Sequence, residues 1–228
     1  WCALTGKGLT VDSAGFAVGT SLALPDAVGE HGRLVKKGAG VFTLYGACTF
    51  TGPVVVQGGS LALGNSGLVT LAGGCEVDGG ALLDTSARAL NFTLPAGTRS
   101  RIDGERRLAA GNTLTVTNGA SLCGTGVVGR VVFLSGAAFA RDAASGSALM
   151  TASSCEMQAG AAITLTGYTP ADLRAGIPLL SSASFSAPRV DGVAVTLDGV
   201  PQKYVVLRAS SGTLTAYSYQ PGTMIQIR

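Results

Sequence analysis

A short phrase that recurs about every 20 residues constrains the fold of this chain more than any other feature. The phrase is an apolar residue, two further residues, a glycine, then small residues and a second apolar residue, as in Val56 to Leu61. The copies are centred on Gly59, Gly80, Gly119, Gly136 and Gly160, with weaker ones on Gly19, Gly38 and Gly97. Because a unit this short cannot bury its own apolar face, the copies must stack on one another. The repeat therefore predicts a solenoid.

Each repeat reads as short strands joined by tight turns. Apolar residues alternate with small or polar ones, as in Phe42-Thr43-Leu44, which is typical of a strand with one buried face. The repeat glycine supplies the bend, since a positive φ has no steric cost for glycine. The 34 glycines and the low charged fraction of 13% agree with an all-β chain. Stacked strands of this kind form a parallel β-helix, and a repeat of about 20 residues predicts about eleven turns.

We expect the β-helix to occupy residues 1–167 and a cap of antiparallel β-structure to occupy residues 168–228. In the cap, Thr169 can begin a short helix that starts at Pro170 and stops at Gly176. The stretch 203–219 reads as a β-hairpin that turns at residues 210–212. A cap of this kind covers the exposed sheet edge at the end of a β-helix. A ligand platform lined by the tyrosines of the hairpin is the alternative interpretation.

The residues expected in the core are Phe42, Leu44, Phe50, Val56, Leu61, Leu63, Leu82, Val116, Leu122 and Phe139.

Gly124, Gly126 and Gly129 have the spacing of a dinucleotide-binding loop. Such a loop must open a helix and be followed about 20 residues later by an acidic residue that binds the ribose. The residues after Gly129 are instead strand-like, and Asp142 stands at the wrong distance with no helix before it. We therefore expect these glycines to lie in or between strands, and we expect no nucleotide or other cofactor.

The one charge-dense segment is TRSRIDGERR, residues 98–107. Its alternating signs favour a solvated loop that leaves the coil. Its arginines, Arg99, Arg101, Arg106 and Arg107, are the candidates for a weak contact with an anionic glycan or a protein partner. A catalytic cluster on a β-helix needs charged residues at matching positions of successive turns, and the repeat positions supply only Asp78 as a carboxylate. We therefore expect no catalytic residue and no enzymatic activity.

The cysteines and the single histidine give no sign of a metal site. The five cysteines show no C-x-x-C spacing, so most are expected to be small buried hydrophobic residues, with one or two disulfides between neighbouring turns as the alternative. His31 lies between glycine-rich residues and is expected on a surface turn, which leaves no Ser–His–Asp triad.

The net charge of +3 is too small to indicate nucleic acid, and no apolar run approaches the length of a membrane helix. The chain starts in mid-pattern at Trp1, which predicts a mature product or an excised fragment.

Residues 34–64, LVKKGAGVFTLYGACTFTGPVVVQGGSLALG, resemble the autotransporter-associated β-strand repeat, also called the passenger-associated transport repeat, of exported bacterial proteins. The agreement includes the opening pattern Leu34-x-Lys36-x-Gly38-x-Gly40 and the closing Leu61-x-Leu63-Gly64. Residues 119–139 are similar to a phrase that commonly follows such repeats. The resemblance implies a right-handed parallel β-helix that forms the stalk of a long passenger, outside the cell or on the surface of a bacterium. Its implied partners are other parts of a longer surface protein and an extracellular or host glycan or protein.

The function predicted from the sequence is thus a non-catalytic structural or adhesive segment of an exported bacterial protein. The alternative is a β-helix polysaccharide-binding module, or a lyase-like enzyme, that acts on acidic glycans. Acidic and basic residues stacked on one flank of the coil would favour that alternative.

Overall fold

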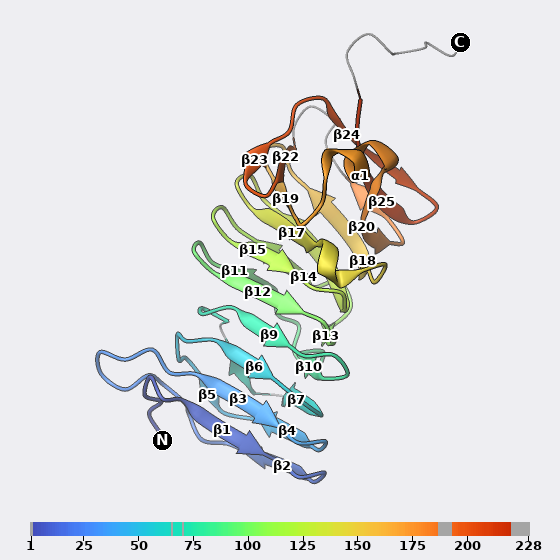
Figure 1. Ribbon diagram of the computed structural model, residues 1–228. Coiled ribbons are helices and arrows are strands. Elements are labelled where there is room, and N and C mark those ends of the chain that lie inside the picture. The colour runs from blue at the N-terminus through green and yellow to red at the C-terminus, as the bar shows by residue number, and fades with distance from the viewer. Residues whose placement is uncertain (1, 65, 70, 187–192, 220–228) are drawn as a thin grey trace.

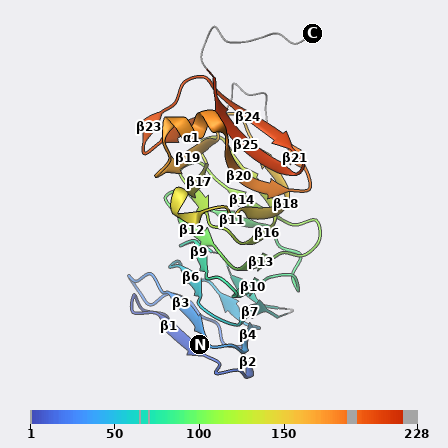
Figure 2. The same cartoon turned by 45° about the vertical axis from the view of Figure 1, so that its right-hand side comes forward.

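The computed structural model describes residues 2–64, 66–69, 71–186 and 193–219. The chain winds into a β-solenoid of about seven turns with roughly 23 residues per turn, and the turns stack from the N-terminal end to the C-terminal end (Figure 1). Each turn contributes a strand to each of two long parallel sheets, which Figure 2 shows from a second side. The predicted parallel β-helix is therefore confirmed, with longer and fewer turns than the eleven expected.

The first sheet, in the order in which its neighbours pair, contains β1 (Leu9–Asp12), β3 (Leu34–Lys37), β6 (Val54–Val56), β9 (Cys75–Val77), β12 (Arg99–Ile102), β15 (Ser121–Cys123), β17 (Ala138–Asp142), β19 (Ala162–Thr166), β22 (Ala194–Leu197) and β23 (Val200–Pro201). The second contains β2 (Ala17–Thr20), β4 (Val41–Leu44), β7 (Ser60–Leu63), β10 (Leu82–Asp84), β13 (Glu105–Arg107), β16 (Val127–Phe133), β18 (Met150–Met157), β20 (Ile177–Ser182), β25 (Thr213–Ser218) and β24 (Val205–Ser210).

A third side of the coil is built from shorter strands. They are β5 (Ala47–Cys48), β8 (Leu68–Val69), β11 (Phe92–Leu94), β14 (Thr113–Val116) and β21 (Phe185–Ser186). The first half of β16 pairs with β13 and its second half pairs with β14. β16 is therefore one continuous strand at a corner where the preceding turn has a loop between two strands. This difference at the corners makes the repeat uneven. Leu9 pairs with Leu34 and Ser121 with Ala138, steps of 25 and 17 residues.

The core is the inside of the coil, where side chains of successive turns lie over one another. Nine of the ten residues expected there are buried, at 5% exposure or less. Leu82 is the exception, since it is half-buried while its neighbour Leu83 is fully buried. The register explains the error: Leu83, not Leu82, pairs with the inward-facing Leu61. Successive residues of a strand point to opposite faces, so a shift of one position turned the side chain outward.

All but one of the repeat glycines lie in bends between strands, as predicted, and these bends either leave the first sheet or lead into it. Seven of the eight have φ between +59° and +84°, and the eighth, Gly19, lies within β2. The triplet Gly124, Gly126 and Gly129 also lies where predicted, since Gly124 follows β15, Gly126 precedes β16 and Gly129 is inside β16. No helix begins in the described residues directly after them. A Cβ on Gly126 would collide with the carbonyl oxygen of Gly104 in the turn below, so close stacking of turns accounts for this glycine.

The C-terminal end of the coil is closed. The predicted helix is present as α1 (Pro170–Ala175), where Thr169 and Asp172 form a capping box. The predicted hairpin is present as β24 and β25, and β25 adds to β20 in antiparallel fashion. Leu173 of the helix and Leu214 of the hairpin are buried against the core. Parallel pairing continues beyond residue 167, because β19 pairs with β22 and β18 with β20.

The N-terminal end is open by comparison. Val18 pairs with Phe42, whose side chain points into the coil, so the Val18 side chain has the same direction. Val18 is nevertheless 42% exposed, whereas Phe42 is 5% exposed. Leu9 and Val11, which pair with residues of β3, are only partly buried. The first turn thus exposes one end of the hydrophobic core.

Candidate functional site

The charge-dense segment 98–107 belongs to the coil and is not the solvated loop that its composition suggested. Residues 99–102 form β12 and residues 105–107 form β13, with only Asp103 and Gly104 between the two strands. Alternation then fixes the side-chain directions. Arg99 and Arg101 are exposed on the first sheet and Arg107 on the second, whereas Arg106 points inward and is buried. The four candidate arginines therefore do not share one surface, and the burial of Arg106 rules it out as a surface contact.

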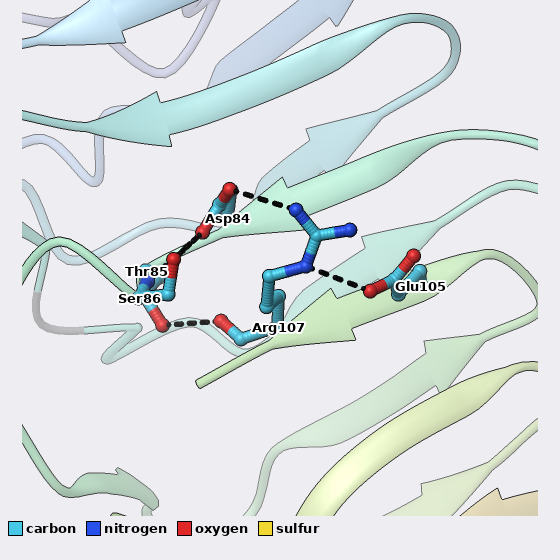
Figure 3. Close-up of polar contacts among 5 residues, drawn as sticks. All are labelled: Asp84, Thr85, Ser86, Glu105 and Arg107. Carbon is cyan, nitrogen blue, oxygen red and sulfur yellow. Dashed lines mark hydrogen bonds and ion pairs between the residues drawn. The ribbon is translucent and has the colours of Figure 1, made fainter. Parts of the chain in front are cut away.

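Arg107 is held between two carboxylates (Figure 3). Its Nε lies 2.9 Å from Glu105 Oε1, and its Nη1 lies 3.3 Å from Asp84 Oδ2 in the turn below. Asp84 also accepts from Ser86, while Thr85 donates to the Arg107 carbonyl oxygen at 2.9 Å. The carboxylates, Glu105 first, hold the pKa of Arg107 above its usual value. Arg107 therefore stays protonated, and two carboxylates on the flank of the coil balance its charge.

Arg106 is a cation inside the hydrophobic core. Its guanidinium carbon lies 4.5 Å from the centre of the Phe92 ring. All three of its nitrogens are buried, and none forms a hydrogen bond with a described atom. Burial lowers the pKa of Arg106. The nearby Cys75 side chain interacts with the guanidinium electrostatically and acts against this shift, although no hydrogen bond joins the two groups. Sequence reasoning missed this position, although the alternation of Arg99-Ser100-Arg101-Ile102 and Glu105-Arg106-Arg107 contained the signal.

Lys36 is a second buried cation, but its charge is well solvated by the backbone. Its Nζ donates to the carbonyl oxygens of Lys37, Gly38 and Gly58 at 2.6, 2.8 and 3.1 Å. The first two belong to its own bend and the third to the bend of the next turn. Burial lowers the pKa of Lys36 and the charge of Asp12 acts against that shift. The lysine of the 34–40 pattern thus fastens two successive bends together, which is a structural role.

A hollow of about 440 Å³ lies on the second flank, beside the loop 108–112. It arises because residues 108–112 form a loop at a corner of the coil, whereas β16 and β18 continue without a loop at the same corner in the next two turns. Arg107, Arg130, Asn112, Ser153 and Ser154 line it. Arg130 lies 3.7 Å from Glu156, so the two exposed arginines of this hollow, Arg107 and Arg130, both have carboxylate neighbours. Two further hollows lie beside Arg99 and Arg101 on the first sheet.

The residues set aside by the sequence analysis lie as follows. His31 is on an exposed turn, as predicted, and its Nδ1 lies 2.6 Å from Thr51 Oγ1. Thr51 also donates to Asp26, which accepts from the Gly32 amide as well. These bonds, that of the Thr51 side chain first, lower the pKa of Asp26. This polar knot joins two neighbouring turns, and no sequence pattern pointed to it.

The cysteines are small core residues, as predicted. All five are free thiols, and all but Cys2 are buried. Burial raises the pKa of Cys48 to about 11 and that of Cys155 to about 12. A thiol attacks only as its thiolate, so these two groups are poor nucleophiles.

Within the described part of the chain, no three His, Cys, Asp or Glu side chains gather closely enough to hold a metal ion. No helix among the described residues is long and apolar enough to span a membrane.

Comparison with known proteins gives one match. Residues 34–63 match the family model of the passenger-associated transport repeat, which confirms the resemblance drawn from this segment. The matched residues comprise β3, β4, β5, β6 and β7, so one such repeat covers more than one turn of the solenoid. No curated protein and no solved structure is similar enough to the chain to count as a match.

Proposed function

We propose that this chain is a non-catalytic, stalk-like segment of an exported bacterial surface protein, with an adhesive role on its flanks. The family of the matched repeat supports export, since it occurs in the passenger domains of autotransporters. The fold supports the stalk, because a stack of parallel strand pairings makes a rod whose length grows with each turn.

The observation that carries this proposal is the difference between the two ends of the coil. The C-terminal end is closed by α1 and the hairpin, whereas Val18 of the first turn faces along the core and remains 42% exposed. The outer edges of β1 and β2 pair with no described strand. Because these edges lie on different sides of the coil, a further solenoid turn would cover both with the same geometry that joins β1 to β3 and β2 to β4. This geometry supports the proposal that the segment stacks on other parts of a longer surface protein.

The export proposal is tested on intact cells of the source organism. An antibody raised against this segment should label unpermeabilised cells or the culture medium, and protease added outside the cells should remove the label. Recovery of the segment only with a cytoplasmic marker protein would contradict the proposal.

One observation favours the glycan-binding alternative over a purely structural role. Acidic and basic residues do stack on the flanks, since Glu76 pairs in register with Arg101, and Asp84 with Arg107. A lyase is poorly supported by the same residues. An arginine that abstracts a proton needs a lowered pKa and access to substrate, but Arg107 has a raised pKa and Arg106 is buried. Incubation with pectate or alginate should release no product, and cleavage that Arg107→Ala abolishes would overturn this conclusion.

A further inference from the structure

Three arginines from two strands are among the residues that line a small hollow on the first sheet. Arg99 and Arg101 come from β12, and Arg141 comes from β17, two strands further along the sheet. The hollow has a volume of about 40 Å³, much smaller than the 440 Å³ of the hollow beside the loop 108–112. We therefore assign a small group, such as a carboxylate, to it.

The positive charge of this hollow is only partly balanced by the described residues. Arg141 is 5% exposed, and its two terminal nitrogens donate to the carbonyl oxygens of Gly146 and Ala148 at 2.8 Å. Its Nε is buried without a described hydrogen-bond partner, and no described carboxylate forms an ion pair with it. Arg99 is exposed and likewise forms no ion pair with a described residue.

The acidic residues nearby are engaged by the protein itself. Arg101 pairs with Asp103, which also accepts from the backbone amide of Thr125 at 3.0 Å. Asp142 is the one carboxylate that lines the small hollow, and it caps the short 3-10 helix η1 (Ala143–Ser145) by accepting from the Ala144 amide. Arg101 is thus paired with Asp103 and the buried Arg141 is held by backbone carbonyls, which leaves Arg99 as the exposed arginine of this hollow with no described carboxylate partner.

A larger hollow of about 310 Å³ adjoins the small one and shares Arg101, Asp142 and Ser145 with it. Its other polar lining groups are Asp103 and Thr125. Carboxylate and hydroxyl oxygens accept hydrogen bonds from hydroxyl groups, so this hollow suits a neutral, hydroxyl-rich ring. The small hollow suits the anion, because arginine forms strong charge-assisted hydrogen bonds with carboxylates.

We propose that these two adjoining hollows bind one acidic sugar residue of a glycan, with its carboxylate against Arg99 and Arg101 and its hydroxyl groups against Asp103, Thr125 and Ser145. The proposal names a site and a ligand class on the flank of the stalk. It stands independently of export, because a purified chain binds or fails to bind wherever the natural protein resides.

The test is calorimetric titration of the full chain with three oligosaccharides of equal length. One is built of uronic acids, one is the neutral counterpart, and one is sulfated and lacks carboxylates. We expect saturable binding of the uronic acid oligomer and no binding of the neutral one. Binding of the sulfated oligomer with equal affinity would overturn the assignment of a carboxylate and leave a general anion site instead.

The matched variants are Arg99→Gln and Arg107→Gln. Both side chains are exposed, so neither change threatens the fold, but Arg107 lies on the other sheet between two carboxylates. The Arg99→Gln variant loses one charge-assisted hydrogen bond, so its affinity for the uronic acid oligomer should fall by about tenfold or more. Arg107→Gln should leave the affinity unchanged. Equal losses in both variants would show a diffuse attraction to the coil, and an unchanged affinity in Arg99→Gln would refute the site.

Discussion

Replacement of Arg106 by methionine should stabilise the solenoid. Arg106 is 1% exposed, its buried nitrogens form no hydrogen bond with a described atom, and the Cys75 side chain offsets only part of the fall in its pKa that burial causes. Desolvation of an ion costs several kcal/mol in a protein interior, and exchange of buried charges for apolar side chains of similar size has raised stability by about 1–4 kcal/mol. Against this gain stands the contact with the Phe92 ring at 4.5 Å, since a desolvated cation–π contact contributes about 2 kcal/mol. We therefore expect a net gain of up to about 2 kcal/mol in the free energy of unfolding.

The assay is urea unfolding followed by far-ultraviolet circular dichroism, with Arg107→Met as the control. Arg107 is next in sequence but exposed on the flank, so its replacement should leave the unfolding midpoint almost unchanged. Arg106→Met should move the midpoint to higher urea concentration. A midpoint that moves to lower concentration in Arg106→Met alone would refute the reasoning, because it would mean that the buried guanidinium is well solvated within the fold.

Three further outcomes are expected. Lys36→Met should lower stability by about 2–4 kcal/mol in the same assay, because three carbonyl oxygens lose a charged donor; an unchanged midpoint would contradict this role. Leu61→Ala should cost about 2–5 kcal/mol and Leu82→Ala clearly less, since only Leu61 is fully buried; equal losses would place the register in doubt. A thiol-specific reagent should modify only Cys2 in the folded chain and all five cysteines in denaturant, whereas rapid reaction of a second thiol would contradict the burial of the other four.

The sequence predicted those parts of the fold that depend on local chemistry. The repeat glycines predicted the bends, and Thr169, Pro170 and Gly176 predicted the single α-helix because a capping residue, a proline and a glycine each act within one turn. The length of a solenoid turn could not be predicted in the same way. It depends on whether a corner carries a loop, as at 108–112, or is crossed by one continuous strand, as in β16.

The arginine cluster shows why the candidate site was harder to predict. High charge density suggested a loop, but alternation within β12 and β13 keeps all but one of these charges outside the coil. Arg141 was not a candidate at all, because it stands far from Arg99 in sequence and lines the same hollow only through the stacking of β12, β15 and β17. The polar knot of Asp26 and Thr51 also joins different turns. Contacts between turns require the register, which single-sequence patterns give only to within a residue or two.

The most direct test of the account is a set of distances along the first sheet. Thr10, Arg101 and Thr164 occupy matching, outward-facing positions in the ladder that runs from β1 through β12 to β19. Spin labels are attached to cysteines at Thr10 and Arg101, and in a second sample at Thr10 and Thr164, after the exposed Cys2 is changed to serine. With strands about 4.8 Å apart, pulsed electron resonance should give distances near 19 Å over four steps and near 34 Å over seven. Two distances that fail to grow in proportion to the number of turns would contradict a stacked parallel solenoid.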